Sequence, residues 1–517
     1  MQGLPHEDAI MEQMLAWLDR PSPREQRHFL ETHPDLLSPE SDTILQALLA
    51  QEADQIKSGQ KFRDALFLLQ DIRGRGEKGG AIREGYVNLY GGFALDLPPW
   101  LEEIEVQLTV LKQAKEPEQT AEERVAMLDK ALQRAQKEKD LAPEILATLR
   151  YELASALWRR HKHSSLLEAG ITLCEQVLDN YTLTHYPQQY AQTQSVLGNI
   201  YRICIKGNKR ENLEQAIAYF QNALRIHICE VFPSEYAQIQ NYLGLTYWER
   251  TDGERRENLE LAIACYQAAL RVWTLETFPG GYARLQNNLG NAYWQRVMGD
   301  RCENLELAIV CFQNALYVFT QEVFSQGYAT IQMNLGCVYR ERIVGERGEN
   351  LEQAITCLQE SLRIWTLELF PYDYALSYIN LGAVYRIRLA GEQRENLEQA
   401  IACYRKALQV WTLEAFPEGY TRLQNNLGYV YRERPIGERS ENLKQAIFSF
   451  REAVNVWTLD VFPSDYRLTQ LNIAKTEALR GNWNAVHKAY QASLAAEELL
   501  ISLGTGVAGY DAVLKEG

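Results

Sequence analysis

Two columns of polar residues recur along this 517-residue sequence at an interval of 46 residues. Asparagine precedes the leucine of an L-G-x-x-Y motif, and arginine or tryptophan follows its tyrosine. The asparagines are Asn288, Asn334, Asn380 and Asn426, and the residues after the tyrosine include Trp248, Trp294, Arg340, Arg386 and Arg432. Asparagine amides can bridge the N–H and C=O groups of an extended peptide, and arginines can hold carboxylates with paired donors. The columns therefore predict recognition of a peptide, preferably an acidic or C-terminal segment.

A second explanation of the arginines stays open. Glutamates stand beside them in the repeat, at Glu249, Glu341 and Glu433, and a further arginine column follows two places on. Arginine and glutamate could therefore pair between copies and hold the copies in register. Exposed ion pairs of this kind are common and contribute little free energy each.

The repeated segment predicts two helices in each copy. The first begins at a proline such as Pro279, which suits a first helical turn because its missing N–H is not needed there. Its apolar residues share one face at helical spacing, and Asn287 and Asn291 lie on the opposite face with the polar columns. Gly299 ends this helix. The second helix is expected to begin at Asn304 as N-cap, in a capping box with a glutamine three positions later in four copies.

Neither helix can bury its apolar stripe alone, so successive pairs must stack into a continuous core. The motifs L-G-x-x-Y and A-x3-F-x2-A (Ala308, Phe312, Ala315) resemble the tetratricopeptide repeat, or TPR. A usual unit has about 34 residues. The additional residues are expected in the hairpin loop and in a longer second helix that includes "VWTLE". The resemblance implies an all-α, right-handed α-solenoid of TPR-like hairpins, with the polar columns lining a concave groove.

A narrower resemblance concerns the segments "FPxxYAxxQNNLGxxYxxR", "GERxENLEQAI" and "LISLGTGVAGYDAVLKEG". They are similar to the N-terminal TPR arms of bacterial CHAT-domain proteins, in which a caspase-like cysteine protease domain follows the array. No His and Cys pair follows residue 500, so the resemblance implies the arm without the protease.

The expected organisation has five parts. They are a helical N-terminal cap at 1–73, a Gly-rich linker at 74–98, a helical lead-in at 99–140, about eight TPR-like repeats at 141–500, and a C-terminal tail at 501–517. An aromatic column, Trp273, Trp365, Trp411 and Trp457 with Phe319 and His227 in register, is expected to pack between repeats. An aromatic cage is the alternative.

Other motifs that could carry chemistry lack the context that they need. Two G-x-G-x-x-G matches begin at Gly74 and Gly504, but neither follows a strand, so both are interpreted as linkers. His161 and His163 have no acidic or cysteine partners at ligand spacing. Cysteines at the repeat interval fit a reduced apolar core. We therefore expect no catalytic residues, no metal and no cofactor.

The bulk composition limits the partners. A formal net charge of −15 argues against nucleic-acid and anionic-membrane binding, because both need a basic surface. The sequence contains no spanning apolar run and no signal peptide, which predicts a cytoplasmic protein. The first hypothesis is a non-catalytic scaffold that binds a protein segment in the solenoid groove. The second is the regulatory arm of a CHAT-type protease system, and an RNA-binding array is disfavoured.

Overall fold

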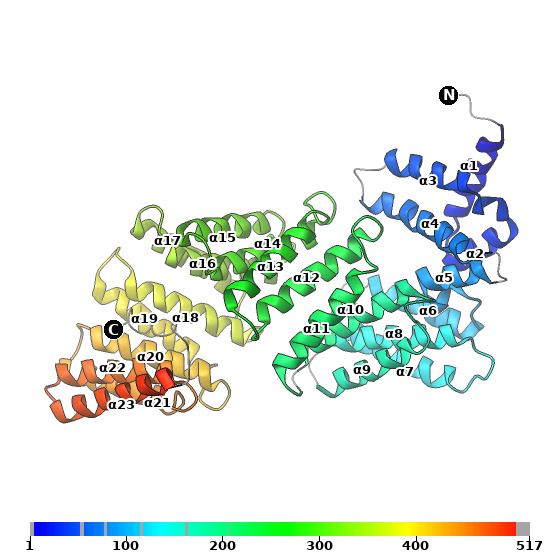
Figure 1. Cartoon of the computed structure of the whole chain (residues 1–517). Helices are drawn as coiled ribbons and strands as arrows, with labels where there is room; N and C mark the ends of the chain where they lie inside the picture. Colours follow the sequence, from blue (N-terminus) through cyan, green and yellow to red (C-terminus); the bar gives the residue numbers. More distant parts are fainter. Residues whose placement is uncertain are drawn as a thin grey trace. The chain divides into compact units, whose positions relative to one another are not determined.

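The computed structural model describes residues 5–51, 56–76, 80–113, 117–160, 164–204 and 206–502. Every regular element among these residues is an α-helix or a short 3-10 helix, so the chain is all-α as the sequence predicts (Figure 1). The chain forms two compact units, Met1–Val297 and Met298–Gly517. The division falls inside the repeat array instead of at one of the expected boundaries. A solenoid makes contacts mainly between neighbouring repeats, so its sequence carries no strong signal for such a division.

The first unit begins with helices that precede the repeats. They are α1 (Pro5–Leu18), α2 (Pro23–Thr32), η1 (Pro34–Leu37), α3 (Pro39–Gln51), α4 (Ile56–Gly74), α5 (Ala81–Tyr90), η2 (Gly92–Ala94), α6 (Pro99–Gln113) and α7 (Pro117–Ala135). Met14, Trp17 and Leu30 are buried at the centre of a core that α1 to α5 share. Trp17 Nε1 donates to Tyr86 Oη over 2.8 Å, which satisfies both buried polar groups.

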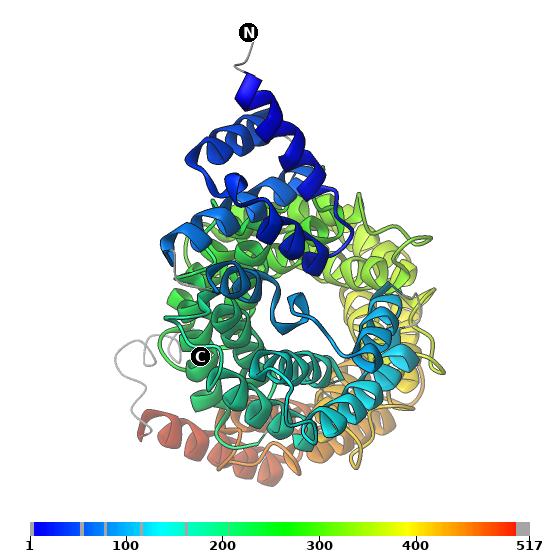
Figure 2. The same cartoon turned by 90° about the vertical axis from the view of Figure 1, so that its right-hand side faces the viewer.

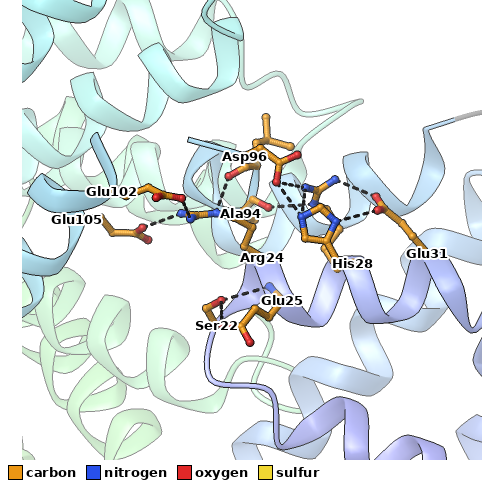
Figure 3. Close-up of polar contacts among 11 residues, drawn as sticks. Ser22, Arg24, Glu25, His28, Glu31, Ala94, Asp96, Glu102 and Glu105 are labelled. Atoms are coloured by element: carbon orange, nitrogen blue, oxygen red, sulfur yellow. Dashed lines mark hydrogen bonds and ion pairs between the residues drawn. The ribbon is translucent and has the colours of Figure 1, made fainter. Parts of the chain in front are cut away.

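Two arginines of α2 attach the N-terminal helices to the segment that follows α5 (Figure 3). Arg24 donates to Glu102 and Glu105 of α6 over 2.5 and 2.8 Å, and its Nε donates to the Leu95 carbonyl over 2.9 Å. Arg27 donates to Asp96 over 2.8 Å, and these contacts hold the pKa of the Asp96 carboxyl below its ordinary value despite the opposing effect of desolvation. These charged contacts fix how α2 lies on η2 and α6.

The sequence predicts a Gly-rich linker at 74–98, but the described part of this segment contains α5 and η2, and residues 85–89 are buried. Tyr86, Val87 and Asn88 are all 0% exposed. Asn88 Oδ1 accepts the Gln188 backbone N–H over 2.9 Å, so α5 is bonded to the first full-length repeat. The glycines suggested a loop because glycine is frequent in turns, but tertiary packing of the intervening aromatic and apolar residues outweighs that preference.

The rest of the first unit consists of helical hairpins. Its helices are α8 (Pro143–Arg160), α9 (Ser164–Leu178), α10 (Pro187–Ile203), α11 (Lys209–Leu224), α12 (Pro233–Glu249), α13 (Arg255–Leu270) and α14 (Pro279–Gln295). We call α8, α10, α12 and α14 first helices, because each begins a repeat, and α9, α11 and α13 second helices. Each second helix packs against its own first helix and against the first helix of the next repeat.

The second unit continues the same pattern from α15 (Arg301–Leu316), a second helix. It contains the hairpins α16 (Ser325–Glu341) with α17 (Arg347–Leu362), α18 (Pro371–Ile387) with α19 (Gln393–Ala407), α20 (Pro417–Glu433) with α21 (Arg439–Val454), and α22 (Pro463–Leu479) with α23 (Trp483–Ser502). These hairpins stack in chain order, from yellow-green to red (Figures 1 and 2). The last hairpin has the short turn that the sequence predicts, at residues 480–482.

The two helices of a hairpin approach most closely at the glycine of L-G-x-x-Y. A Cβ atom on Gly382 would lie 2.6 Å from Cε1 of Tyr404, and one on Gly428 would lie 2.5 Å from Cε1 of Phe450. Tyr404 and Phe450 are 0% exposed. The absence of a side chain on the first helix therefore makes room for a ring from the second helix, and the ring fills the space between them.

The prolines and turn glycines lie where the sequence predicts them. Pro279 and its equivalents occupy the first turn of their helices. Gly299 has a φ of 80°, in the left-handed region that favours glycine, and the equivalent turn glycines have similar values.

The predicted N-cap of the second helices is wrong. Helix α15 begins at Arg301 with Asp300 as its N-cap, whose side chain accepts the Glu303 N–H, and Asn304 is a buried residue inside the first turn. Asn304 Nδ2 donates to the Met298 carbonyl over 2.8 Å, and Asn350 Nδ2 donates to the Val344 carbonyl over 2.8 Å. The asparagine thus bonds the loop instead of capping the helix, and in α15 the side chain of Asp300 takes the cap.

The expected extension of the second helix through "VWTLE" is also wrong. Helix α13 ends at Leu270, and residues 271–278 form turns that lead into the next first helix. Trp273 N donates to the Ala269 carbonyl over 2.9 Å, which starts a compact turn. The glycine motif at 504–509, His161, His163, the tail from 503 and residues 77–79 of the first glycine motif lie outside the described residues.

Substitution of Gly382 tests the close approach of the two helices. Gly382→Ala should lower the free energy of unfolding by about 1 to 3 kcal/mol, because the new Cβ must displace Tyr404. Gly348→Ala is the matched control in helix α17, where no atom lies within 4 Å of the added Cβ. It should stabilise the protein by up to about 1 kcal/mol. Urea unfolding followed by circular dichroism measures both, and equal effects would contradict the close-packing explanation.

Candidate functional site

The predicted asparagine column lies on the first helices, half-buried or buried. Asn288 Nδ2 in α14 donates to Asn241 Oδ1 in α12 over 3.0 Å, so this asparagine links two neighbouring first helices. Asn334 in α16 is 9% exposed, and Asn380 in α18 and Asn426 in α20 are half-buried. The column therefore takes part in contacts between repeats, and its half-buried members also reach the surface.

The remaining polar positions of the first unit lie on the same side of α12 and α14. Asn287, Asn291, Trp248 and Trp294 are all half-buried. The guanidinium of Arg255 lies 5.5 Å from the ring centroid of Trp248, which is within the range of a cation–π contact. Trp248 is thus covered in part by a side chain of its own hairpin.

The arginine column is engaged by partners in the chain. Arg386 lies 3.7 Å from Glu433 of the next first helix, and Arg432 donates to Asn472 of the next first helix over 3.2 Å. Arg340 pairs with its neighbour Glu341 over 3.3 Å. In the first unit, Arg202 and Glu249 repeat the pairing between neighbouring first helices at 2.7 Å. This geometry matches the explanation in which arginine and glutamate hold copies in register.

The second arginine column forms a repeated contact among three helices. Arg342 at the end of α16 donates through Nε and Nη2 to both oxygens of Glu306 in α15, over 2.8 and 2.9 Å, and through Nη1 to Asn350 in α17 over 3.3 Å. Hydrogen bonding to Glu306 raises the pKa of Arg342. Equivalent two-bonded pairs are Arg250 with Glu214, Arg296 with Glu260, Arg388 with Glu352, and Arg434 with Glu398.

The aromatic column packs between repeats, as the sequence favours. Trp365 is 4% exposed and lies 4.8 Å from Phe370 between ring centroids, and Trp411 is 3% exposed beside Phe416. In the first unit His227 occupies the same column and lies 5.3 Å from Phe232. Around Trp411 the packing also leaves a hollow of about 320 Å³, which Tyr372 and Phe416 help to line.

Three first helices of the first unit enclose a hollow that the repeat columns do not reveal. This first-unit hollow has a volume of about 280 Å³ and is lined by residues of α8, α10 and α12 together with His227. Its lining includes Trp158, Gln192, Asn199, Gln238 and Tyr242. One signal was present in the sequence, because Asn199 falls in the same column as Asn291. The α8 residues could not be found in this way, since that first copy is degenerate.

Features of other kinds of site can be assessed only within the described residues. They contain no group of three or more histidine, cysteine, aspartate or glutamate residues that could hold a metal ion. No described helix is long and apolar enough to cross a membrane. Burial raises the pKa of Cys265, Cys311, Cys357 and Cys403 to about 12, so these thiols stay protonated and unreactive near neutral pH.

Comparison with known proteins supports the fold. No family model and no curated protein matches the sequence. The apo form of RapI is 13% identical, with a TM-score of 0.51 over 77% of this chain and 96% of RapI. The tetratricopeptide-repeat STAND protein PH0952 from Pyrococcus horikoshii is 14% identical, with a TM-score of 0.45 over 92% of this chain and 74% of that one. The APC/C hetero-tetramer Cut9–Hcn1 is 14% identical, with a TM-score of 0.43 over 84% and 72%.

The likeness to RapI concerns the fold alone, since the identity is low. The chain is an all-α solenoid of TPR-like helical hairpins, and the similarity to RapI agrees with the stacking described above. The TPR-like repeat that the motifs predict is therefore confirmed.

Replacement of Arg342 tests the three-helix contact. Arg342→Lys keeps the charge but loses the two parallel bonds to Glu306, and should lower the free energy of unfolding by about 0.5 to 1 kcal/mol. Arg363→Lys is the control, because Arg363 is exposed and pairs with Glu360 of its own helix through one nitrogen. Its effect should stay below about 0.3 kcal/mol. Urea unfolding at two salt concentrations measures both variants. An Arg342→Lys variant with an unchanged free energy of unfolding would contradict the stabilising role of the contact with Glu306.

Acid should destabilise the first unit through His227. Burial lowers the pKa of this histidine from 6.5 to about 4 in the folded chain, so between these values the unfolded chain binds the additional proton. The contribution of neutral His227 to the free energy of unfolding is fully present above pH 6.5. It is lost as the pH falls toward 4, by up to about 3 kcal/mol. His227→Phe, which places the residue of Phe319 in this column, should remove that part of the pH dependence. If the free energy of unfolding falls equally between pH 7 and 4 in the original chain and in His227→Phe, this role of His227 is contradicted.

Proposed function

We propose that this chain is a non-catalytic interaction scaffold that binds an extended segment of a partner protein along the exposed side of its first helices. The first-unit hollow carries the proposal. It is formed by three successive first helices and is lined by amides, hydroxyls, carboxylates, the guanidinium of Arg159 and several aromatic rings. Mixed linings of this kind suit protein segments, because rings supply contact area while amides bond the peptide main chain.

The asparagine column extends this surface along the first helices. Half-buried amides such as Asn380 and Asn426 reach the surface, where they can bond a peptide backbone. An acidic segment would have to take Arg386 from Glu433 and Arg432 from Asn472. The proposal therefore places recognition on the amides and on the hollow, and the preference for an acidic segment stays a prediction from the sequence.

A link to a caspase-like protease is the second candidate. It rests on the similarity of "FPxxYAxxQNNLGxxYxxR" and the neighbouring segments to the arms of CHAT-domain proteins. In that case, binding of the segment would control a protease domain that is not part of residues 1–517. The coding sequence beyond codon 517 and its genomic neighbours test the link, and a gene neighbourhood without a caspase-like domain would contradict it.

Selection from a displayed library of random linear peptides tests the scaffold function. Selected peptides should bind the full chain in isothermal titration calorimetry, and the double variant Gln192→Ala with Gln238→Ala should weaken them at least about tenfold. These two glutamines line the hollow without filling the core. The matched control is Gln215→Ala with Gln353→Ala, two exposed glutamines of second helices, which should leave the affinity unchanged.

Two results would contradict the proposed function. One is a selection that enriches no peptide above the background of an unrelated helical protein. The other is a set of binders that loses affinity in the second-helix variant and keeps it in the first-helix variant.

A further inference from the structure

The first-unit hollow contains polar atoms that the protein leaves without partners. Asn199 is 2% exposed, and its Nδ2 donates to the Ser195 carbonyl over 3.0 Å, while its Oδ1 has no hydrogen-bond partner among the described residues. Buried polar groups in proteins nearly always have a partner. An unpartnered amide oxygen in the wall of a hollow is therefore an acceptor for something that enters it.

His227 supplies a second acceptor. It is 1% exposed, and its Nε2 lies 2.8 Å from Gln188 Oε1. Because an amide oxygen can only accept, Nε2 carries the proton and Nδ1 is left with a lone pair. That Nδ1 also has no partner among the described residues. The repeat equivalents of His227 are Tyr181, Trp273, Phe319, Trp365, Trp411 and Trp457, so a histidine stands in this column only in the copy that borders the hollow.

Glu235 supplies the third acceptor and a charge. This residue lines the hollow from the first turn of α12, and its buried Oε2 has no partner among the described residues. Desolvation by burial raises the pKa of the Glu235 carboxyl. A carboxylate that has lost water in this way gains most from a cation brought to it. Glu152 also lines the hollow, but Arg124 already pairs with it.

Two aromatic rings form part of the same wall. The rings of Trp158 and Tyr242 lie 6.1 Å apart between centroids at an interplanar angle of 87°. Planar guanidinium groups stack on such rings, whereas ammonium groups are compact and strongly hydrated. The exposed Arg159 also lines the hollow and lies 5.8 Å from the Trp158 ring centroid, so an entering arginine would displace this side chain from that ring.

From these observations we propose that the first-unit hollow is a specificity pocket for an arginine side chain of the bound segment. Asn199, His227 and Glu235 accept the guanidinium N–H groups. Its plane stacks on one of the two perpendicular rings, Trp158 or Tyr242, and its edge meets the other. Five donors in a fixed fork can reach three separate acceptors, which the three donors of a lysine ammonium do less well. A volume of about 280 Å³ is at the lower end for ligand pockets and suits one large side chain.

The pocket deepens the proposed function and rests on it, because the arginine belongs to the segment that the scaffold binds. Four peptides test the pocket directly. Each is a blocked heptapeptide of glycine and serine with arginine, lysine, citrulline or glutamate at its centre. Saturation-transfer NMR with the full chain should show binding of the arginine peptide. The citrulline peptide, which has the same shape without the charge, should bind at least about tenfold more weakly, and the glutamate peptide should not bind.

Two variants and one repeat equivalent locate the binding. Glu235→Gln and Asn199→Leu should each weaken the arginine peptide about tenfold. The matched control is Asp373→Asn, which changes the place of Glu235 in another repeat away from the hollow and should leave the affinity unchanged. Circular dichroism confirms that each variant is folded. Glu235→Gln keeps the shape of the side chain, so it tests the pocket even if Asn199→Leu unfolds.

Several outcomes would overturn the pocket. They are equal binding of the arginine and citrulline peptides, tighter binding of lysine or glutamate, unchanged binding in Glu235→Gln, or no binding of any of the four. A library selection that enriches segments without arginine, which still depend on Gln192 and Gln238, would remove the pocket and leave the proposed function standing. Loss of all selected binders would instead remove the proposed function.

Discussion

The close contact between the glycine of L-G-x-x-Y on a first helix and a side chain from its second helix is the constraint on which the structure depends. Gly244 faces Tyr266, Gly336 faces Leu358 and Gly428 faces Phe450, each at a distance that leaves no space for a methyl group. This contact sets how closely the two helices lie and how far one has slid along the other. Because the same contact recurs every 46 residues, each hairpin offers the next one a surface of the same shape.

The charged contacts act on top of this packing. The pair of Arg388 with Glu352 joins a first helix to the preceding second helix, and Asn396 links the same arginine to the following one. These groups are partly exposed, so they contribute less to stability than the apolar core does, but they fix direction and register. The polar residues of the first helices therefore divide into those that hold repeats together and those that reach the surface. Peptide recognition can use the second group.

Much of the fold could be predicted from the sequence, since prolines, turn glycines and apolar stripes act locally. The starts of the second helices could not, because the N-cap depended on which polar residue of one loop reaches the helix, and Asp300 takes the place expected for Asn304. Helix α5 was not predicted, because the glycines around it indicated a linker. The polar columns that recur every 46 residues predicted the polar faces of α12 to α20. These columns did not predict the first-unit hollow, since it is formed by α8, α10 and α12 together and α8 belongs to a degenerate copy.

The central claim is that a partner segment lies along the first helices. Photo-crosslinking with a benzophenone amino acid tests it most directly, with a selected peptide as the target and mass spectrometry as the readout. A crosslinker at Gln238 on α12 should attach to the peptide, whereas one at Leu261 on the outer side of α13 should not. Crosslinks from Leu261 with none from Gln238 would contradict the account.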